Sequence, residues 1–181
     1  ALSRRSLATA TDRFQAAMSL FGDLDAQHGI AECLVGLAVV ARLRGDHSVA
    51  LTWCERALML QRKSGTGDAV FTRLEMARVR IALGEIEEAQ IELISVAEAA
   101  AEHGQRTVLA QAHAALLLAA SLTGQWDDWD VHLAEVQRLT VATGLVEASL
   151  ADAAQDAAVA AVAADQRDRA RDALEIALGQ W

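Results

Sequence analysis

The stretch Gly45-Asp-His-Ser-Val-Ala50-Leu-Thr-Trp-Cys-Glu-Arg-Ala57 holds a pattern that recurs along the chain: a turn residue, a small residue five positions later, and another seven positions beyond it. The second of these positions recurs with steps of 40, 39, 40 and 41 residues, at Ala10, Ala50, Ala89, Trp129 and Ala170. A fixed period of this length indicates stacked supersecondary units, each of which buries its apolar face against its neighbours.

A second series of glycines lies half a period away, at Gly29, Gly67, Gly104 and Gly144. Glycine tolerates the left-handed conformation that ends a helix, so two alternating series predict the two turns of a helix–turn–helix repeat. The sequence therefore predicts one all-α domain over 1–181, an α-solenoid of stacked antiparallel helix pairs with about nine helices. They are expected over about 2–22, then 30–44 with 46–63, 68–83 with 85–102, 105–123 with 125–142, and 145–164 with 166–178.

The repeat resembles the tetratricopeptide-repeat family in its bacterial form of about 40 residues per repeat, over roughly residues 2 to 178. Small residues occupy the family's contact positions at Ala38, Ala50 and Ala57, at Ala77 and Ala89, and at Ala158, Ala170 and Ala177. The third hairpin departs from the family pattern, because Leu117 and Trp129 stand where small residues are expected. We therefore expect different local packing in that hairpin.

Composition and charge restrict the partners. Of 181 residues 53% are hydrophobic, none is proline or tyrosine, and the net charge is −9, which disfavours binding to nucleic acid phosphates. Apolar runs such as Ala114 to Ala120 are shorter than the roughly 20 residues of a membrane helix, so no membrane association is expected. Cys33 and Cys54 lack metal-type spacing, which favours reduced core cysteines and a cytoplasmic location.

The sequence offers little catalytic chemistry. It contains no phosphate-binding glycine loop, no nucleophile elbow and no His-Glu-x-x-His helix. The five histidines are never three or four residues apart, so no single helix presents two of them as metal ligands: His28, His47, His103, His113 and His132. We expect a protein without enzymatic activity, cofactor or metal.

The family resemblance implies that the first helix of each pair lines a concave groove that binds a protein or peptide. The corresponding positions are Glu32, Val35, Val39, Arg42, Phe71, Leu74, Arg78, Ile81, Gln111 and Leu118. A groove that is mainly apolar and contains two arginines suits an amphipathic helix, or an extended apolar segment with an acidic residue.

A second patch is predicted at Trp126 and Trp129, which lie three residues apart with aspartates around them. Tryptophan is enriched at binding hot spots, so the two rings are candidates for a separate partner site. The alternative is that both rings fill space in an interior that is rich in alanine.

The expected function is that of a non-catalytic scaffold domain within a larger bacterial signalling or regulatory protein. The alternative is an effector- or peptide-sensing domain of a signalling ATPase, transcription regulator or kinase. Because the chain starts inside a repeat, we expect a piece of a longer protein whose first helix lacks its partner. Leu7, Phe14 and Met18 would then be partly exposed, and the open array ends would favour self-association.

Overall fold

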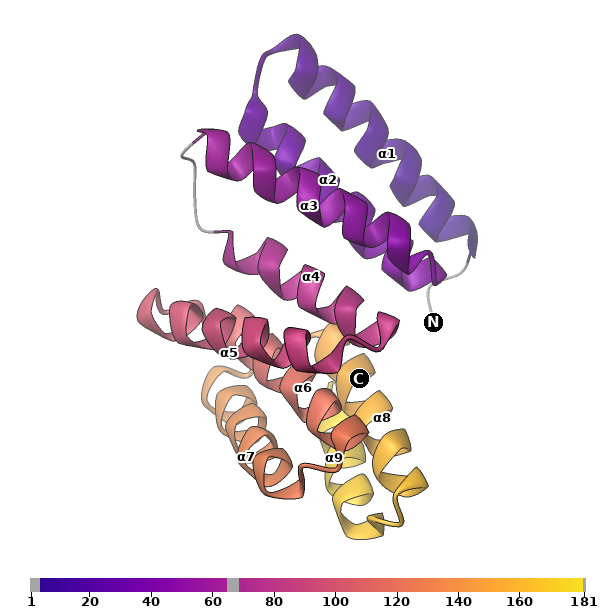
Figure 1. Ribbon diagram of the computed structural model, residues 1–181, viewed down its shortest axis with the longest axis vertical. Helices are drawn as coiled ribbons and strands as arrows, with labels where there is room; N and C mark the ends of the chain where they lie inside the picture. Colours follow the sequence, from indigo (N-terminus) through magenta and orange to yellow (C-terminus); the bar gives the residue numbers. More distant parts are fainter. Residues whose placement is uncertain (1–3, 65–68, 181) are drawn as a thin grey trace. The chain divides into compact units, whose positions relative to one another are not determined.

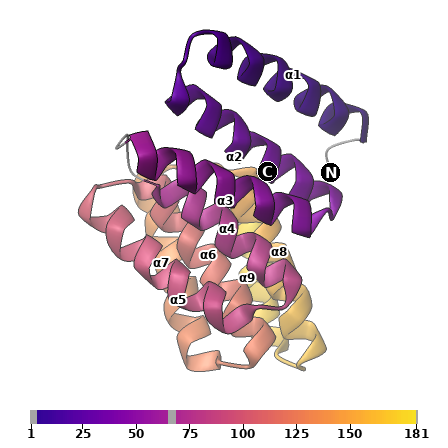
Figure 2. The same ribbon diagram turned by 45° about the horizontal axis from the view of Figure 1, so that its top comes forward.

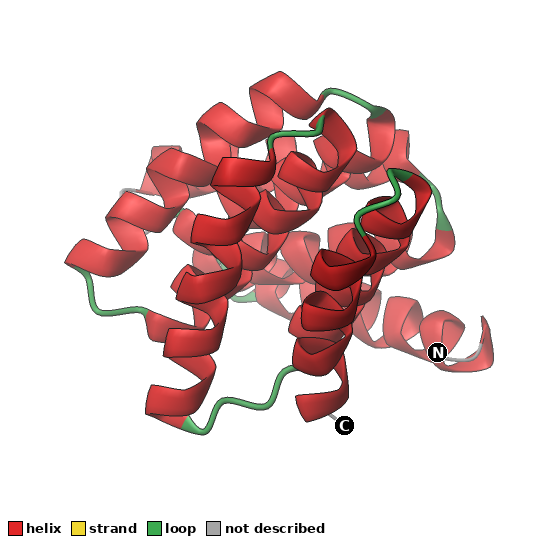
Figure 3. Cartoon of the chain, turned by 90° about the horizontal axis from the view of Figure 1, so that it is seen from below, coloured by secondary structure: helices red, strands yellow, loops and turns green. Residues whose placement is uncertain are grey.

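The computed structural model describes residues 4–64 and 69–180, and the regular secondary structure in these ranges is entirely α-helical (Figure 3). The predicted fold class, an all-α helical-repeat protein, is confirmed. All nine expected helices are present in the described ranges, with ends displaced by at most three residues. They are α1 (Arg4–Asp23), α2 (Gln27–Arg44), α3 (His47–Ser64), α4 (Val70–Leu83), α5 (Ile86–Glu102), α6 (Arg106–Thr123), α7 (Trp126–Thr143), α8 (Ala148–Ala163) and α9 (Arg167–Gly179).

The helices form two compact units, Ala1–Glu85 with α1 to α4 and Ile86–Trp181 with α5 to α9. In the first unit α2 packs against α1, α3 and α4. Figures 1 and 2 show α1 and α3 as neighbours of α2. In the second unit α6 packs against α5, α7 and α8, and α8 pairs with α9. Each unit thus has one central helix, α2 or α6, with neighbours on three sides.

Small residues at the repeat positions are buried. Ala38, Ala77 and Ala158, one from each of three first helices, are almost completely buried. The second-helix positions are buried as well, at Ala50, Ala57, Ala89, Val96, Ala170 and Ala177. Short side chains let neighbouring helices approach closely, so small residues recur in the sequence at positions that the fold buries.

The turn glycines end helices in the left-handed conformation. Gly45, Gly84 and Gly124 have φ values of 86°, 84° and 71°, and each is the C-cap of a first helix. The backbone N–H of Gly45 donates to the carbonyl of Arg42, and the next N–H donates to Ala41, which satisfies carbonyls at the helix end. In the fourth hairpin Asp165 takes the equivalent place with a φ of 59°.

The second glycine series is confirmed in part. Gly104 and Gly144 also have positive φ and lie in turns. The prediction for Gly29 is wrong, because this residue lies inside α2 and the turn before α2 contains Asp25 with a φ of 49°. Gly67 lies outside the described residues.

Helix α1 packs closely against the helix that follows it. It packs against α2, where the ring of Phe14 lies against Gly36 and the ring of Phe21 against Gly29. A Cβ atom at Gly29 would lie 2.5 Å from the Phe21 ring, so both glycines allow a close approach. Of the three apolar residues expected to be partly exposed, Phe14 and Met18 are half-buried as expected, whereas the prediction for Leu7 is wrong because its side chain is buried. Self-association stays a prediction.

The second unit has a continuous core that extends from α6 to α9. Leu117 and Trp129, the two large residues of the third hairpin, are both completely buried in it, together with Val136, Leu150 and Ala173. None of the helices in the described ranges is long and apolar enough to cross a bilayer.

Candidate functional site

A buried ion cluster joins α2 to α4 in the first unit. The guanidinium of Arg42 donates from Nε to Glu75 Oε2 at 3.1 Å, and Arg78 Nη1 donates to Glu75 Oε1 at 2.6 Å. Arg42 comes from the last turn of α2, whereas Glu75 and Arg78 are one turn apart on α4. The cluster exists because α2 and α4, the first helices of successive pairs, contact each other directly.

The cluster is unusual in its burial. The side chain of Glu75 is 2% exposed, that of Arg78 10% and that of Arg42 22%. Burial by itself would raise the pKa of Glu75, but the charges and hydrogen bonds of Arg78 and Arg42 outweigh it and hold that pKa below its usual value. The carboxylate is thus ionised at neutral pH, and one of the two positive charges has no counter-charge within the cluster.

One atom of the cluster is left without a partner. Arg78 Nη2 is buried and makes no hydrogen bond to any part of the chain that the structure describes. Buried guanidinium nitrogens are normally hydrogen-bonded, because an unsatisfied donor costs about 1–3 kcal/mol or more. This nitrogen is therefore an unsatisfied donor in the interior of the cluster.

Apolar side chains accompany the arginines on the same two helices. Val39 lies one turn before Arg42 on α2 and is half-buried, while Phe71 lies one turn before Glu75 on α4 and is 42% exposed. We call Val39, Arg42, Phe71 and Arg78 the α2/α4 surface. It combines accessible apolar area with an excess of positive charge.

Several residues predicted to line the groove belong to the interior instead. Val35, Leu74 and Ile81 are buried. Val35 packs with Leu34 and Ala57, because α2 is the central helix of its unit and α1 covers one more of its sides. The assignment of these three residues to a binding surface is corrected accordingly. Glu32 is exposed and lies 3.9 Å from His28, at the other end of α2.

The predicted groove positions of the second unit are also largely covered. Gln111 is buried, and its Nε2 donates to the hydroxyl of Ser149 on α8 at 2.8 Å, so it contributes to helix packing rather than to a groove. Leu118 is partly buried against the core of this unit. The assignment of Gln111 to a groove surface is therefore wrong, whereas Leu118 keeps part of its side chain exposed.

The second predicted patch is wrong for Trp129. This residue is completely buried, and its indole N–H donates to the hydroxyl of Ser121 at 2.8 Å. Trp126 is only partly buried, and the guanidinium of Arg169 lies 5.6 Å from its ring centroid. Arg169 also donates to both carboxylate oxygens of Asp130, at 2.9 and 2.7 Å. For Trp129 the alternative interpretation, in which the ring fills space in the interior, is confirmed.

Sequence reasoning selected both arginines of the cluster but not Glu75. The available signal was a carboxylate three residues before Arg78, and it is the only acidic residue in the stretch from Val70 to Ile81. A charge within a buried run requires a partner, and Arg78 is the nearest cation on the same helix face. The contribution of Arg42 depends on the packing of α2 against α4, which spacing alone does not reveal.

Comparisons with known proteins identify the fold alone. No family model matches the chain, and no curated protein matches it. Among solved structures, the crystal structure of BtubC (BKLC) from P. vanneervenii is similar over 97% of this chain and 72% of that one, with a TM-score of 0.68 and 18% sequence identity. At this identity the similarity supports a shared helical architecture.

Proposed function

We propose that this chain is a non-catalytic protein-interaction module of the tetratricopeptide-repeat type, and that it acts within a larger bacterial signalling or regulatory protein. Its partner is a protein or peptide segment that combines apolar residues with a carboxylate and binds the α2/α4 surface. The observation that supports this proposal is the cluster of Arg42, Glu75 and Arg78, in which two arginines share one carboxylate.

The chemistry of the cluster favours an acidic ligand. A carboxylate of the partner would add the missing negative charge and accept hydrogen bonds from guanidinium groups that the fold already holds in place. Hydrogen bonds to charged groups contribute about 1.5–3 kcal/mol each. Phe71 and Val39 offer apolar contact beside the charge, and aromatic residues and arginine are enriched where interfaces are tightest.

A cytoplasmic location forms part of the proposal. Cys33 and Cys54 are both buried and both free. Free cysteines are usual in the reducing interior of cells, whereas secreted proteins mostly pair them.

Selection from a random peptide library tests the proposal. A phage-displayed library of 16-residue peptides is selected on the immobilised chain, and recovered peptides are synthesised and titrated by calorimetry. We expect enrichment of sequences with Asp or Glu beside apolar residues, and a loss of affinity of about tenfold for Arg42→Gln, equivalent to about 1.4 kcal/mol. Arg42 suits this test because it is the more exposed arginine.

The matched control is Arg80→Gln. Arg80 also lies on α4, with a side chain that is 28% exposed and 3.8 Å from Glu85, and it is not part of the cluster. Its substitution should leave peptide affinity within about twofold. Peptides without acidic residues, or an affinity that Arg42→Gln leaves unchanged, would contradict the proposed surface.

A further inference from the structure

Two histidines that are far apart in the sequence face each other across the α6/α7 hairpin. The Nδ1 atoms of His113 on α6 and His132 on α7 are 3.3 Å apart, within hydrogen-bonding distance. Their ring centroids are 5.4 Å apart and the ring planes are tilted by 46°. Both side chains are half-buried, so the pair is held by the packing of the two helices yet is accessible to small solutes.

The surroundings keep both rings neutral. Burial lowers the pKa of His113, and Arg138 adds to this effect while Glu135 opposes it. Burial and the neighbouring His113 lower the pKa of His132 to about 4, against the opposing influence of Asp128. Neutral imidazoles carry the lone pair that a metal ion requires, so at neutral pH no proton has to be released before binding.

The distance between the two nitrogens matches a metal site. Two nitrogen ligands bound tetrahedrally at about 2.0–2.1 Å from Zn²⁺ are about 3.3–3.4 Å apart. We propose that His113 and His132 bind a divalent transition-metal cation of the zinc class through their Nδ1 atoms, and that the cation cross-links α6 to α7. The proton of the present Nδ1–H group moves to Nε2 of the same ring by tautomerisation, so that both Nδ1 atoms act as ligands.

The remaining ligands come from outside the pair. Among the described residues, no group of three His, Cys, Asp or Glu side chains is arranged to hold a metal ion, so two coordination positions are left for water or for a donor from a partner. Glu135 lies one turn after His132 on α7, but its carboxylate accepts hydrogen bonds from Arg138 at 2.7 and 3.0 Å. Arg138 therefore engages the carboxylate of Glu135 and adds a positive charge near His113.

Zinc titration of the wild-type chain provides the first test. ZnCl₂ is added at low ionic strength in competition with a chromogenic chelator, and ring nitrogens are followed by long-range ¹H–¹⁵N NMR. We expect one saturable equivalent and a shift of Nδ1 in two histidine rings. At a hundredfold excess of Zn²⁺ over its Kd, the midpoint of thermal unfolding should rise by about 5 °C.

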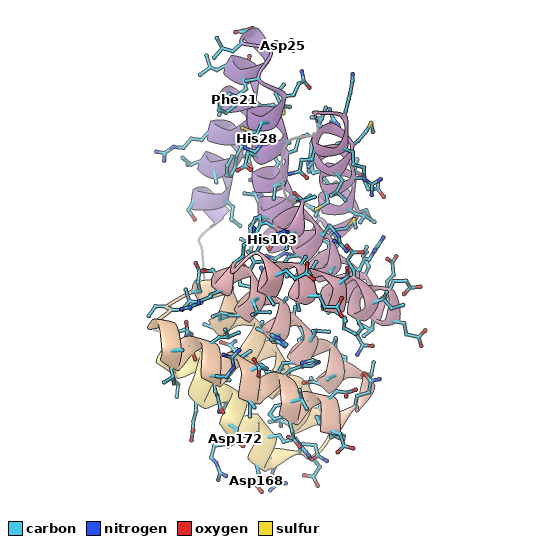
Figure 4. All side chains as sticks on the ribbon, turned by 90° about the vertical axis from the view of Figure 1, so that its left-hand side faces the viewer. Phe21, Asp25, His28, His103, Asp168 and Asp172 are labelled. Carbon is cyan, nitrogen blue, oxygen red and sulfur yellow. The ribbon has the colours of Figure 1, made fainter. Side chains whose placement is uncertain are left out.

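Three substitutions locate the site. His113→Gln and His132→Gln should each weaken Zn²⁺ binding at least tenfold, and Arg138→Gln should strengthen it severalfold because it frees Glu135 and removes a repelling charge. His28→Gln and His103→Gln, at the exposed positions labelled in Figure 4, are controls that should leave the affinity unchanged. Circular dichroism verifies that each variant is folded.

Three results would overturn the proposal. They are the lack of a saturable equivalent, NMR shifts at rings other than the two of the pair, and an affinity that does not respond to Arg138→Gln. The NMR result is obtained on the wild-type chain, so it remains decisive if a histidine variant does not fold.

Discussion

Trp129 and Ser121 form a hydrogen bond inside the second unit, in which the indole nitrogen donates to the hydroxyl oxygen at 2.8 Å. The hydroxyl in turn donates to the carbonyl of Leu117, one turn earlier on α6, at 2.9 Å. Trp129 occupies a position that holds alanine in neighbouring repeats, and its one polar atom is satisfied there. Trp129 thus fits a position where other repeats have a small residue, and its indole N–H is not left without an acceptor.

Ser121→Ala should lower the free energy of unfolding by about 1–3 kcal/mol, because it leaves the buried indole N–H of Trp129 without an acceptor. Trp129→Phe removes the donor, so the double variant should be less destabilised than the sum of the two single variants. Urea unfolding of the four proteins measures this coupling. Strict additivity would show that the hydrogen bond contributes nothing to stability.

Ala50→Leu should lower the midpoint of thermal unfolding. Ala50 is completely buried and packs with Ala41 and Val79, so added methylene groups should cost about 1–3 kcal/mol. Glu87→Ala and Asp168→Ala serve as controls, because both side chains are exposed, as Figure 4 shows for Asp168. These surface changes should stay within about 0.5 kcal/mol. Equal unfolding midpoints would mean that the interior around Ala50 can hold a larger side chain without strain.

Glu75→Gln should destabilise the first unit by about 3–5 kcal/mol at neutral pH, because it leaves Arg42 and Arg78 without their common counter-charge. The pKa of Glu75 is lowered in the folded state, so its stabilising effect is complete above the unfolded-state pKa, about 4.5, and is lost as the pH falls through the folded-state pKa. The difference in stability between the wild type and Glu75→Gln should therefore shrink below about pH 4.5.

Urea unfolding at pH 7 and at pH 3.5 measures that difference. Glu98→Gln, an exposed change on α5, is the control and should show little difference at either pH. A gap between wild type and Glu75→Gln that is equal at both pH values would mean that the ionised carboxylate does not stabilise the fold.

Asp165→Gly should raise the free energy of unfolding by about 0.5–1 kcal/mol. Asp165 holds a left-handed conformation that glycine adopts without strain, and its contact with Arg167 is almost fully exposed and so contributes little.

Gly45→Ala is the reciprocal test. A Cβ atom there would meet no other atom within 4 Å, so the expected loss of about 1–2 kcal/mol is conformational. Chemical unfolding measures both, and a destabilising Asp165→Gly would contradict this explanation.

Cys54 should react very slowly with thiol reagents in the folded protein at pH 8. Burial raises its pKa to about 12, and the nearby carboxylate of Glu75 acts in the same direction. Burial also raises the pKa of Cys33. The thiolate is the reactive form, so both cysteines should be modified only after unfolding. Ellman's reagent, with and without urea, measures this, and rapid reaction of two thiols in the native state would be inconsistent with the packing.

The sequence was most informative where structure follows from local pattern. The period of the small residues located the helices and the buried positions Ala50 and Ala89, because the repeat unit buries the same positions once per period. The positive φ values of Gly45 and Gly124 follow from the same pattern, since a helix end selects glycine.

Features that depend on how helices pack were not predictable from spacing. The pairing of His113 with His132, and of Arg42 with Glu75, requires the rotation of each helix about its own axis to be known. Leu74 was misplaced for a related reason. The family pattern assigns one face of each first helix to a groove. The burial of a residue on that face, however, depends on all the helices that pack against it, and in α4 these are α2 and α3.

The contacts of Phe14 with Gly36 and of Phe21 with Gly29 also fix how far α1 can slide along α2. The two phenylalanines are seven residues apart, and so are the two glycines, in the reverse order that antiparallel helices require. A slip of one helical turn would bring Phe14 opposite Val40 or Glu32 in place of Gly36. The side chain of either residue would fill the space that the ring of Phe14 requires. The alignment of these helices is therefore selected by the absence of side chains at two points.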